Sequence, residues 1–442
     1  MKVDAMFRSI RTPVRFGLAA SLLASSMVLA ATGSENDTPM GWASQNGGTT
    51  GGKGGTVVTV STMADLQKYA KMSGKYIIWV KGSMGSYGTR GEATEDVVTL
   101  SDDKSILGLP GAHVNGNIML SGVKNVIIRN LAVEGPGACD NDCGSAGEAR
   151  KDAITIVSGT TNVWLDHLDV YDGEDGNTDI TKTSNYVTVS WVKFHYTSNS
   201  YPSGTTGKSH RFCNLIGSDD SYTADAGKLK VTFYKTWWGE GVAERMPRCR
   251  FGQIHVANCL FTSTDAGQSH CVRAGFKADL LIESNVFIGQ KKPIDLYNAD
   301  YTAVTAKNNL FTNCSGNTSG DKTSFTPPYT LSLSATSGLQ AELANTTNGA
   351  GPTLVWNTTG IEARASIGPS KVFLDERMGA WSLINASNTD VQADVLSLDG
   401  KQIGASFSIP AGASVEVPSS ASARLIQVKG ANGTQTLPAP GF

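Results

Sequence analysis

The amino-acid sequence predicts an all-β protein: a right-handed parallel β-helix followed by a small β-rich domain. Three observations support this prediction. Val, Ile and Thr recur in short runs among many glycines, as they do in strand-rich proteins. Apolar segments repeat through the middle of the chain without a helical signal between them. The length of 442 residues leaves room for one large domain and a smaller one.

The first 31 residues have the features of an export signal. Lys2 and three arginines precede an apolar run that ends in Val28-Leu29-Ala30, a suitable cleavage sequence. The run is too short to span a membrane comfortably, and no later stretch is a transmembrane candidate. The segment 1–31 is therefore predicted to be a signal peptide, and the mature protein is expected to be secreted, without a membrane partner.

Charge and cysteine content narrow the class of protein further. A net charge of −2 provides no basic excess for nucleic acid, so no nucleic-acid partner is expected. Export would allow the seven cysteines to oxidise, although an odd number leaves at least one unpaired in the expected monomer. Cys139 and Cys143 are close enough in the chain to close a small loop.

The repeated segments set the period of the predicted β-helix. Each is a six-residue run rich in apolar residues, and the seven runs begin at residues 125, 162, 186, 230, 253, 279 and 303. Most steps are 23 to 26 residues, and the longer steps of 37 and 44 require inserted loops. The Asn residues at 130, 258 and 308 suit a turn that stacks coil on coil. A β-sandwich is the alternative, but its turn signals would recur at shorter intervals.

Two carboxylates and an arginine precede three of these segments at similar offsets. Asp152 lies ten residues before the segment at 162, Asp179 seven before the one at 186, and Arg245 eight before the one at 253. In stacked coils such positions share one sheet, and Asp175 can approach from the loop just ahead of Asp179. Three carboxylates suit Ca²⁺, which takes oxygen ligands in irregular geometry. The alternative is that Asp175 is an ordinary turn residue in an Asp- and Gly-rich loop.

An arginine cluster surrounds Pro247. On a regular strand Arg248 and Arg250 would share one face and Arg245 the other, unless the proline bends the strand. The cluster could be a solvated basic strand. Arginines beside a carboxylate-rich site are better suited to an acidic polymer, because the guanidinium fork binds carboxylates with two hydrogen bonds.

Five motifs, in order between residues 41 and 354, resemble the pectate lyase family of polysaccharide lyases. They are the region 41–55, which begins Gly41-Trp-Ala-Ser-Gln; Asn162-Val-Trp-Leu-Asp-His167; Leu215-Ile-Gly-Ser-Asp-Asp-Ser221; Arg245-Met-Pro-Arg-Cys-Arg-Phe-Gly252; and a closing segment with Pro327-Pro-Tyr329 and Ala350-Gly351. The resemblance implies a parallel β-helix that cleaves polygalacturonate, its expected partner, by calcium-dependent β-elimination.

The resemblance also assigns roles to individual residues. It implies that Asp152, Asp175 and Asp179 bind Ca²⁺, that Arg245 is the base and that Arg250 binds substrate. The family carries a Lys shortly before the Leu-Ile-Gly motif. Here Arg211 is nearest to that place and Lys208 is the alternative, so either could be a second substrate-binding residue. Because arginine normally stays protonated, its use as a base requires neighbouring cations that favour the neutral form.

Several other functions fit less well. A pectin lyase would lack the calcium carboxylates, a glycoside hydrolase would need paired carboxylates as acid and base, and a non-catalytic adhesin would leave the arginines unexplained. Asp166 and His167 form a tempting catalytic pair. Adjacent strand residues point to opposite faces, so the sequence predicts a structural role for this motif.

The boundary of the β-helix is predicted at residue 354, which gives a domain from 32 to 354 and a second from 355 to 442. The second domain is rich in Ala, Ser and Val with short β-like runs, as in a small β-sandwich. Its large aromatic residues Trp356 and Trp381 could form a carbohydrate-binding surface. A passive accessory domain is the preferred interpretation.

Overall fold

The computed structural model describes the first domain at residues 31–87, 96–138, 152–200 and 210–356. In the C-terminal part it describes residues 372–377, 380–385, 390–396, 402, 406–410, 414–416, 425–430 and 433–438. Within these ranges no helix is long and apolar enough to cross a membrane.

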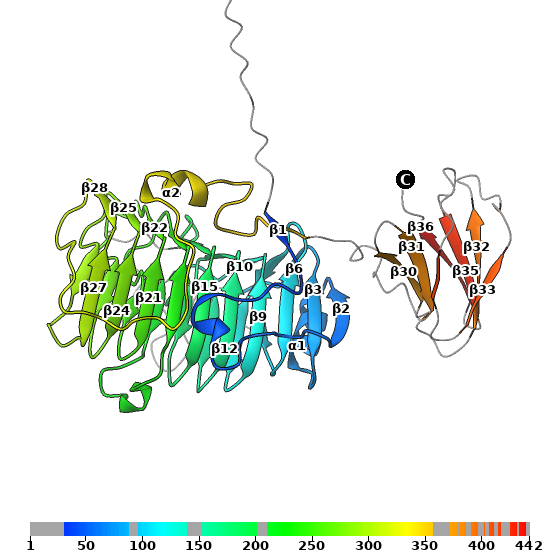
Figure 1. The fold of residues 1–442 in the computed structure, drawn as a ribbon, viewed down its shortest axis with the longest axis horizontal. Helices are drawn as coiled ribbons and strands as arrows, with labels where there is room; N and C mark the ends of the chain where they lie inside the picture. The colour runs from blue at the N-terminus through cyan, green and yellow to red at the C-terminus, as the bar shows by residue number, and fades with distance from the viewer. Residues whose placement is uncertain are drawn as a thin grey trace, which may run out of the picture.

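Three parallel sheets run along the first domain, and the chain visits them in turn, which makes the predicted parallel β-helix (Figure 1). The ten-stranded sheet contains β2 (Thr56–Val60), β3 (Tyr76–Val80), β6 (Lys104–Gly108), β9 (Lys124–Arg129), β12 (Thr161–Asp166), β15 (Asn185–Ser190), β18 (Val231–Tyr234), β21 (Gln253–Ala257), β24 (Asp279–Glu283) and β27 (Ala303–Lys307). The nine-stranded sheet contains β4 (Ser83–Met84), β7 (His113–Asn115), β10 (Ala132–Glu134), β13 (Asp169–Tyr171), β16 (Lys193–His195), β19 (Trp237–Trp238), β22 (Leu260–Phe261), β25 (Val286–Ile288) and β28 (Leu310–Thr312). The eight-stranded sheet contains β5 (Val97–Thr99), β8 (Asn117–Ser121), β11 (Ile154–Val157), β14 (Thr178–Ile180), β17 (Asn214–Ile216), β20 (Arg248–Cys249), β23 (Val272–Ala274) and β26 (Ile294–Leu296).

The core is a continuous column of apolar side chains inside the coils. Equivalent residues stack from coil to coil, as Val187, Val231 and Ile254 do in consecutive strands of the ten-stranded sheet. Such stacking explains why β-branched runs recur at one period, because each coil covers the apolar face of the previous one. The five described cysteines, at 213, 249, 259, 271 and 314, are free thiols, whereas Cys139 and Cys143 lie outside the described residues.

One residue with a positive φ ends each of seven consecutive strands of the ten-stranded sheet. These residues are Asn130, His167, Trp191, Lys235, Asn258, Ser284 and Asn308. The left-handed conformation turns the chain sharply toward the nine-stranded sheet, and Asn adopts it at low cost. The Asn130 side chain also donates to the Gly108 carbonyl of the preceding coil, at 3.0 Å. The expected Asn turn between coils is thereby confirmed.

Short elements cover the ends and outer faces of the β-helix. Helix α1 (Met63–Lys71) begins at Thr62, which caps it, and buries Leu66 and Ala70. The 3-10 helix η1 (Gly41–Ser44) lies on the ten-stranded sheet, and α2 (Thr336–Leu343) buries Leu339 and Leu343 near β22 and β25. A further 3-10 turn, η2, spans Thr223–Asp225.

The β-helix extends two residues past the predicted boundary at 354. Strand β29 (Val355–Trp356) pairs with β1 (Thr32–Gly33), and Trp356 is only 3% exposed, packed against Trp79. Trp356 therefore cannot be an exposed aromatic platform of the second domain. That domain contains two antiparallel sheets, made of β30 (Val372–Arg377), β31 (Ala380–Asn385) and β34 (Ser414–Glu416), and of β33 (Phe407–Ile409), β32 (Val391–Leu396), β35 (Leu425–Gly430) and β36 (Gly433–Pro438).

Candidate active site

Two carboxylates converge on Gly176 at the outer side of the eight-stranded sheet. Asp152 lies two residues before β11, and Asp179 is the middle residue of β14, opposite Thr155 of β11. A side chain at Gly176 would place its Cβ 2.9 Å from Asp152 Oδ1 and 3.2 Å from Asp179 Oδ1. The two oxygens therefore face a common space that a glycine keeps open. The similar offsets in the sequence therefore correspond to neighbouring positions, with Asp179 in a strand and Asp152 just ahead of the adjacent one.

Both carboxylates are held where a negative charge is costly. Burial raises the pKa of Asp152 well above its usual range, and the charges of Asp179 and Asp175 raise it further. Desolvation likewise raises the pKa of Asp179 to about 7, although Arg245 acts in the opposite direction. Arg245 offsets only part of the negative charge of this pair, and a bound cation would offset more of it.

Asp175 approaches the same region but is turned toward a histidine. Its Oδ1 lies 2.6 Å from His210 Nδ1, and its carboxylate is near enough to raise the pKa of both Asp152 and Asp179. Among the described residues, no three His, Cys, Asp or Glu side chains are already gathered as a metal centre. The three predicted calcium ligands are thus neighbours, with two converged and the third held by His210.

The donor set fits a hard cation. Carboxylate oxygens are the ligands that Ca²⁺ prefers, and it accepts irregular coordination. Asp152 and Asp179 offer two oxygens to one space, and burial is the main cause of their raised pKa values, a cost to the charged forms that a bound cation would offset. Asp175 could join them by exchanging its contact with His210 for the cation.

Arg245 lies beside these carboxylates without being paired to either of them. It precedes β20 in the left-handed region, with φ of 61°. Its charge lowers the pKa of both Asp152 and Asp179, yet its guanidinium makes no hydrogen bond or ion pair to any described residue, and its buried Nε lacks a partner there. The guanidinium instead lies over the Phe212 ring, 4.1 Å from the ring centre.

Of the two candidates for the second basic residue, the structure describes only Arg211, which contacts residues other than Arg245. Arg211 Nη1 lies 3.4 Å from Asp265, and its Nη2 donates to the Ser200 carbonyl at 2.9 Å. Arg211 lines a cavity of about 380 Å³ with Tyr196, Glu240 and Asp265. Lys208 lies outside the described residues. The substrate-binding role assigned to Arg211 or Lys208 therefore stays a prediction.

Two residues that the sequence analysis missed stand between Asp175 and Arg245. His210 contacts Asp175 and stacks on Phe212, with ring centres 4.9 Å apart. Phe212 in turn supports Arg245. Their spacing of two residues, which puts both side chains on one side of an extended chain, was the available signal.

Further cations continue the site along the eight-stranded sheet. Arg250 Nε lies 2.6 Å from the exposed Asp220, and its Nη1 donates to the Gly217 carbonyl. Burial lowers the pKa of Arg248, and Arg250 and Arg245 lower it further. Burial and the nearby Arg273 and Arg248 also lower the pKa of His270 to about 2, so this ring is neutral. The cluster gives the sheet a positively charged strip beside its carboxylates.

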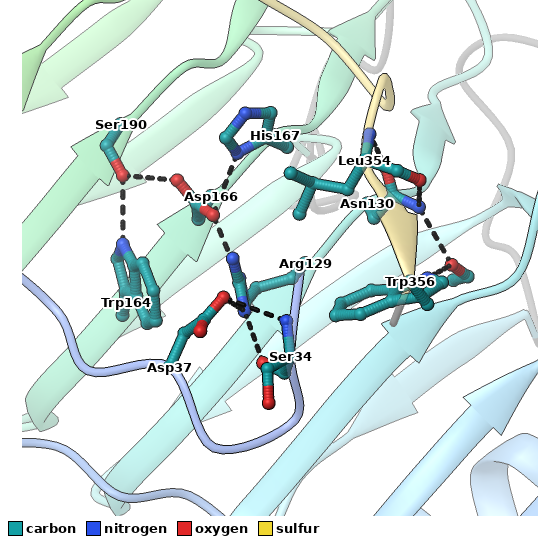
Figure 2. A network of polar contacts seen from close by, with 11 residues as sticks. Ser34, Asp37, Arg129, Asn130, Trp164, Asp166, His167, Ser190, Leu354 and Trp356 are labelled. Carbon is teal, nitrogen blue, oxygen red and sulfur yellow. Dashed lines mark hydrogen bonds and ion pairs between the residues drawn. The ribbon is translucent and has the colours of Figure 1, made fainter. Parts of the chain in front are cut away.

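A second polar network, on the outer side of the ten-stranded sheet, is fully paired (Figure 2). Asp166 lies between Arg129 Nε at 2.8 Å, His167 Nδ1 at 2.9 Å and Ser190 Oγ at 2.6 Å. The sequence argument that Asp166 and His167 point apart was wrong, because the positive φ of His167 rotates its side chain toward Asp166. Arg129 also contacts Ser34 and Asp37, so the motif fastens the N-terminal segment to the β-helix.

A β-helix with converging carboxylates and a strip of arginines on one face defines an enzyme of the kind that acts on acidic polysaccharides. Comparison with known proteins identifies the family. The family model described as pectate lyase matches residues 16–352. The chain therefore belongs to the pectate lyase family, and it is a pectate lyase enzyme that acts on pectate.

Individual relatives agree with this assignment. The chain is 33% identical to pectate lyase E of Dickeya chrysanthemi over 322 residues, which covers 64% of this chain and 79% of that protein. It is also 33% identical to a probable pectate lyase A of Aspergillus niger, covering 76% of this chain and 97% of that protein. Among solved structures, a pectate lyase from Bacillus sp. N165 in complex with trigalacturonate shares the fold, with a TM-score of 0.56, 23% identity, and coverage of 71% and 99%.

Proposed function

We propose that the chain cleaves polygalacturonate by calcium-assisted β-elimination, which leaves an unsaturated oligogalacturonide. One observation carries the proposal: the Arg245 guanidinium lies beside the buried carboxylates of Asp152 and Asp179, yet no ion pair joins it to either of them or to another carboxylate in the described part of the chain. In a structural site these charges would be joined to one another, as Arg129 and Asp166 are.

Each group of residues has a separate task in the proposed reaction. Asp152, Asp179 and Asp175 would hold Ca²⁺, whose positive charge beside the uronate carboxylate would make the adjacent C5 proton more acidic. Arg245 in its neutral form would take this proton on a guanidinium nitrogen. The bond from C4 to the glycosidic oxygen then breaks, a double bond forms between C4 and C5, and the leaving oxygen keeps the electron pair and takes a proton from water.

Arg250 is the residue that we propose holds the substrate carboxylate. Its present partner, Asp220, is 55% exposed, so a uronate could replace it at little cost. Arg248 contributes positive charge to the same strip without direct pairing to a described carboxylate. Arginines in such a strip attract the acidic polymer and stabilise negative charge that develops during elimination.

Export from the cell completes the proposal. The predicted signal peptide at 1–31 would deliver the enzyme to a polymer that is too large to enter the cell. The N-terminal sequencing of protein recovered from the culture medium tests this point, with a new terminus expected near Ala30 or Ala31. Recovery of the enzyme only inside the cell would contradict it.

An ultraviolet assay on polygalacturonate, with and without calcium, tests the reaction. We expect absorbance to rise with the unsaturated product, to stop after exhaustive EGTA treatment and to return when Ca²⁺ is added. Highly methylated pectin is the matched substrate and should react more slowly. New reducing ends without absorbance would indicate hydrolysis, and undiminished activity in EGTA would exclude a required metal.

A further inference from the structure

A continuous stack joins the predicted metal site to the predicted base. Asp175 contacts His210 at 2.6 Å, the His210 ring stacks on Phe212, and the Arg245 guanidinium covers Phe212 at 4.1 Å. The rings of His210 and Phe212 are inclined by only 26°. The stack therefore places two flat groups between a carboxylate and the guanidinium.

Four other described arginines differ from Arg245 because each of them contacts a carboxylate. Arg129, Arg211, Arg250 and Arg273 each contact a carboxylate, at distances between 2.6 and 3.4 Å. Arg245 contacts no carboxylate among the described residues, and its guanidinium lies on the face of the Phe212 ring. A carboxylate in this position would occupy N–H groups of Arg245 and hold its positive charge.

An aromatic face can restrain a guanidinium without using its nitrogen atoms. The attraction acts perpendicular to the guanidinium plane, whereas hydrogen bonds and proton transfer occur within that plane. We propose that Phe212 is a positioning residue for Arg245: its ring fixes the guanidinium plane and leaves the edge nitrogens to the substrate. This inference rests on the proposed role of Arg245 as the base. The His210 ring, stacked on Phe212, keeps the Phe212 ring in place.

Replacement of the ring by an aliphatic side chain tests the inference directly. Phe212→Leu keeps an apolar residue but removes the aromatic face, and we expect kcat on polygalacturonate to fall about tenfold with little change in KM. Phe212→Tyr restores the face and should recover most of the loss. Tyr69→Leu removes an equivalent ring beside Lys68, 4.9 Å away on α1, and serves as the matched control with unchanged kcat. Calcium affinity, measured by calorimetry, should be the same in all these variants.

Fluorinated phenylalanines at position 212 keep the ring shape and weaken its negative face. We expect kcat to fall stepwise with the number of fluorine atoms, while the midpoint of thermal unfolding stays constant. A Phe212→Leu enzyme with unchanged kcat would overturn the inference. If Phe212→Leu proved difficult to fold, the fluorinated series would still decide, because a kcat that does not change with fluorine number would also overturn it.

A double-variant comparison separates this inference from the proposed function. If Arg245→Ala keeps only a small residual kcat and Phe212→Leu lowers that residual kcat no further, the ring acts through Arg245. Full activity of Arg245→Ala would instead refute the role of Arg245 as the base. An inactive Arg245→Ala together with a fully active Phe212→Leu would refute only the positioning role.

Discussion

Two sheets of the same β-helix carry an aspartate–arginine cluster on their outer sides, and the clusters differ in how their charges are satisfied. On the ten-stranded sheet Asp166 is buried, yet His167 and Arg129 outweigh desolvation and hold its pKa at about 2. On the eight-stranded sheet desolvation raises the pKa of Asp179 to about 7, and Arg245 only moderates that rise. The same residue types therefore produce opposite electrostatic states.

The difference separates a structural cluster from a chemical one. Every charge around Asp166 has a partner, so the cluster fastens segments together and has little capacity for a ligand. Asp152, Asp179 and Arg245 are charged groups that are not joined in ion pairs among the described residues. This arrangement costs stability unless a cation and a substrate occupy the site. Incomplete pairing, more than charge itself, marks the functional face.

Removal of the arginine from each cluster should give the largest contrast. Arg245→Ala is expected to lower kcat by about 1,000-fold, because it removes the proposed base. Its thermal midpoint should change little, since Arg245 makes no ion pair with a described residue. Arg129→Ala should do the reverse, lowering the thermal midpoint while the folded enzyme keeps its kcat. Activity assays and thermal unfolding of both variants test this contrast. A fully active Arg245→Ala enzyme would contradict the proposed difference between the two clusters.

Asp→Asn changes should alter stability in opposite directions on the two sheets. Asp166→Asn removes the buried one of the two carboxylates that contact Arg129, leaving the more exposed Asp37, and should cost about 3 kcal/mol in the free energy of unfolding. Asp179→Asn in EGTA should stabilise the protein, because it removes one of two facing carboxylates. Denaturant unfolding at neutral pH measures both effects. Equal destabilisation by the two changes would mean that Asp179 is paired after all.

Acid should weaken the paired cluster in a defined pH range. The folded pKa of Asp166, about 2, lies below its ordinary value of 3.8, so its contribution to stability is complete above pH 3.8. That contribution, about 2 kcal/mol, is lost as the pH falls through 2. We expect the stability difference between the wild-type protein and Asp166→Asn to shrink over this range. A difference that stayed constant would show that Asp166 is not ionised in the folded protein.

The sequence was sufficient for the fold because one period governs the whole β-helix. The repeat spacing, the Asn turns at 130, 258 and 308, and the shared sheet of Asp152 and Asp179 all follow from stacked coils. The end of the β-helix domain was harder to predict from the sequence. Trp356 belongs to the β-helix through pairing of β29 with β1, a contact between segments more than 300 residues apart that no local pattern reveals.

The side-chain partners in the site could not be predicted either, because they also depend on contacts that no local sequence pattern reveals. Motif position suggested that Arg211 or Lys208 accompanies Arg245, but Arg211 is directed to Asp265, while the adjacent Phe212 contacts Arg245. A shift of one residue along an extended chain reverses the side that a side chain faces. The predicted direction of the His167 side chain was wrong for a related reason. Its left-handed backbone ends the strand, so its side chain no longer points to the face opposite Asp166.

The smallest expected effect concerns a single hydrogen bond in the paired cluster. Trp164 Nε1 donates to Ser190 Oγ at 2.9 Å, and the Trp164 ring lies 4.4 Å from the Arg129 guanidinium. Trp164→Phe keeps an aromatic face for Arg129 but removes the donor, so we expect a loss of about 1 kcal/mol in stability. Ser190 still donates to Asp166, which limits the damage to that one bond. Denaturant unfolding measures the loss, and an unchanged kcat would place this tryptophan with the structural cluster. A large fall in kcat with unchanged stability would instead show that the cluster around Asp166 takes part in the reaction, which would contradict the distinction between the two clusters.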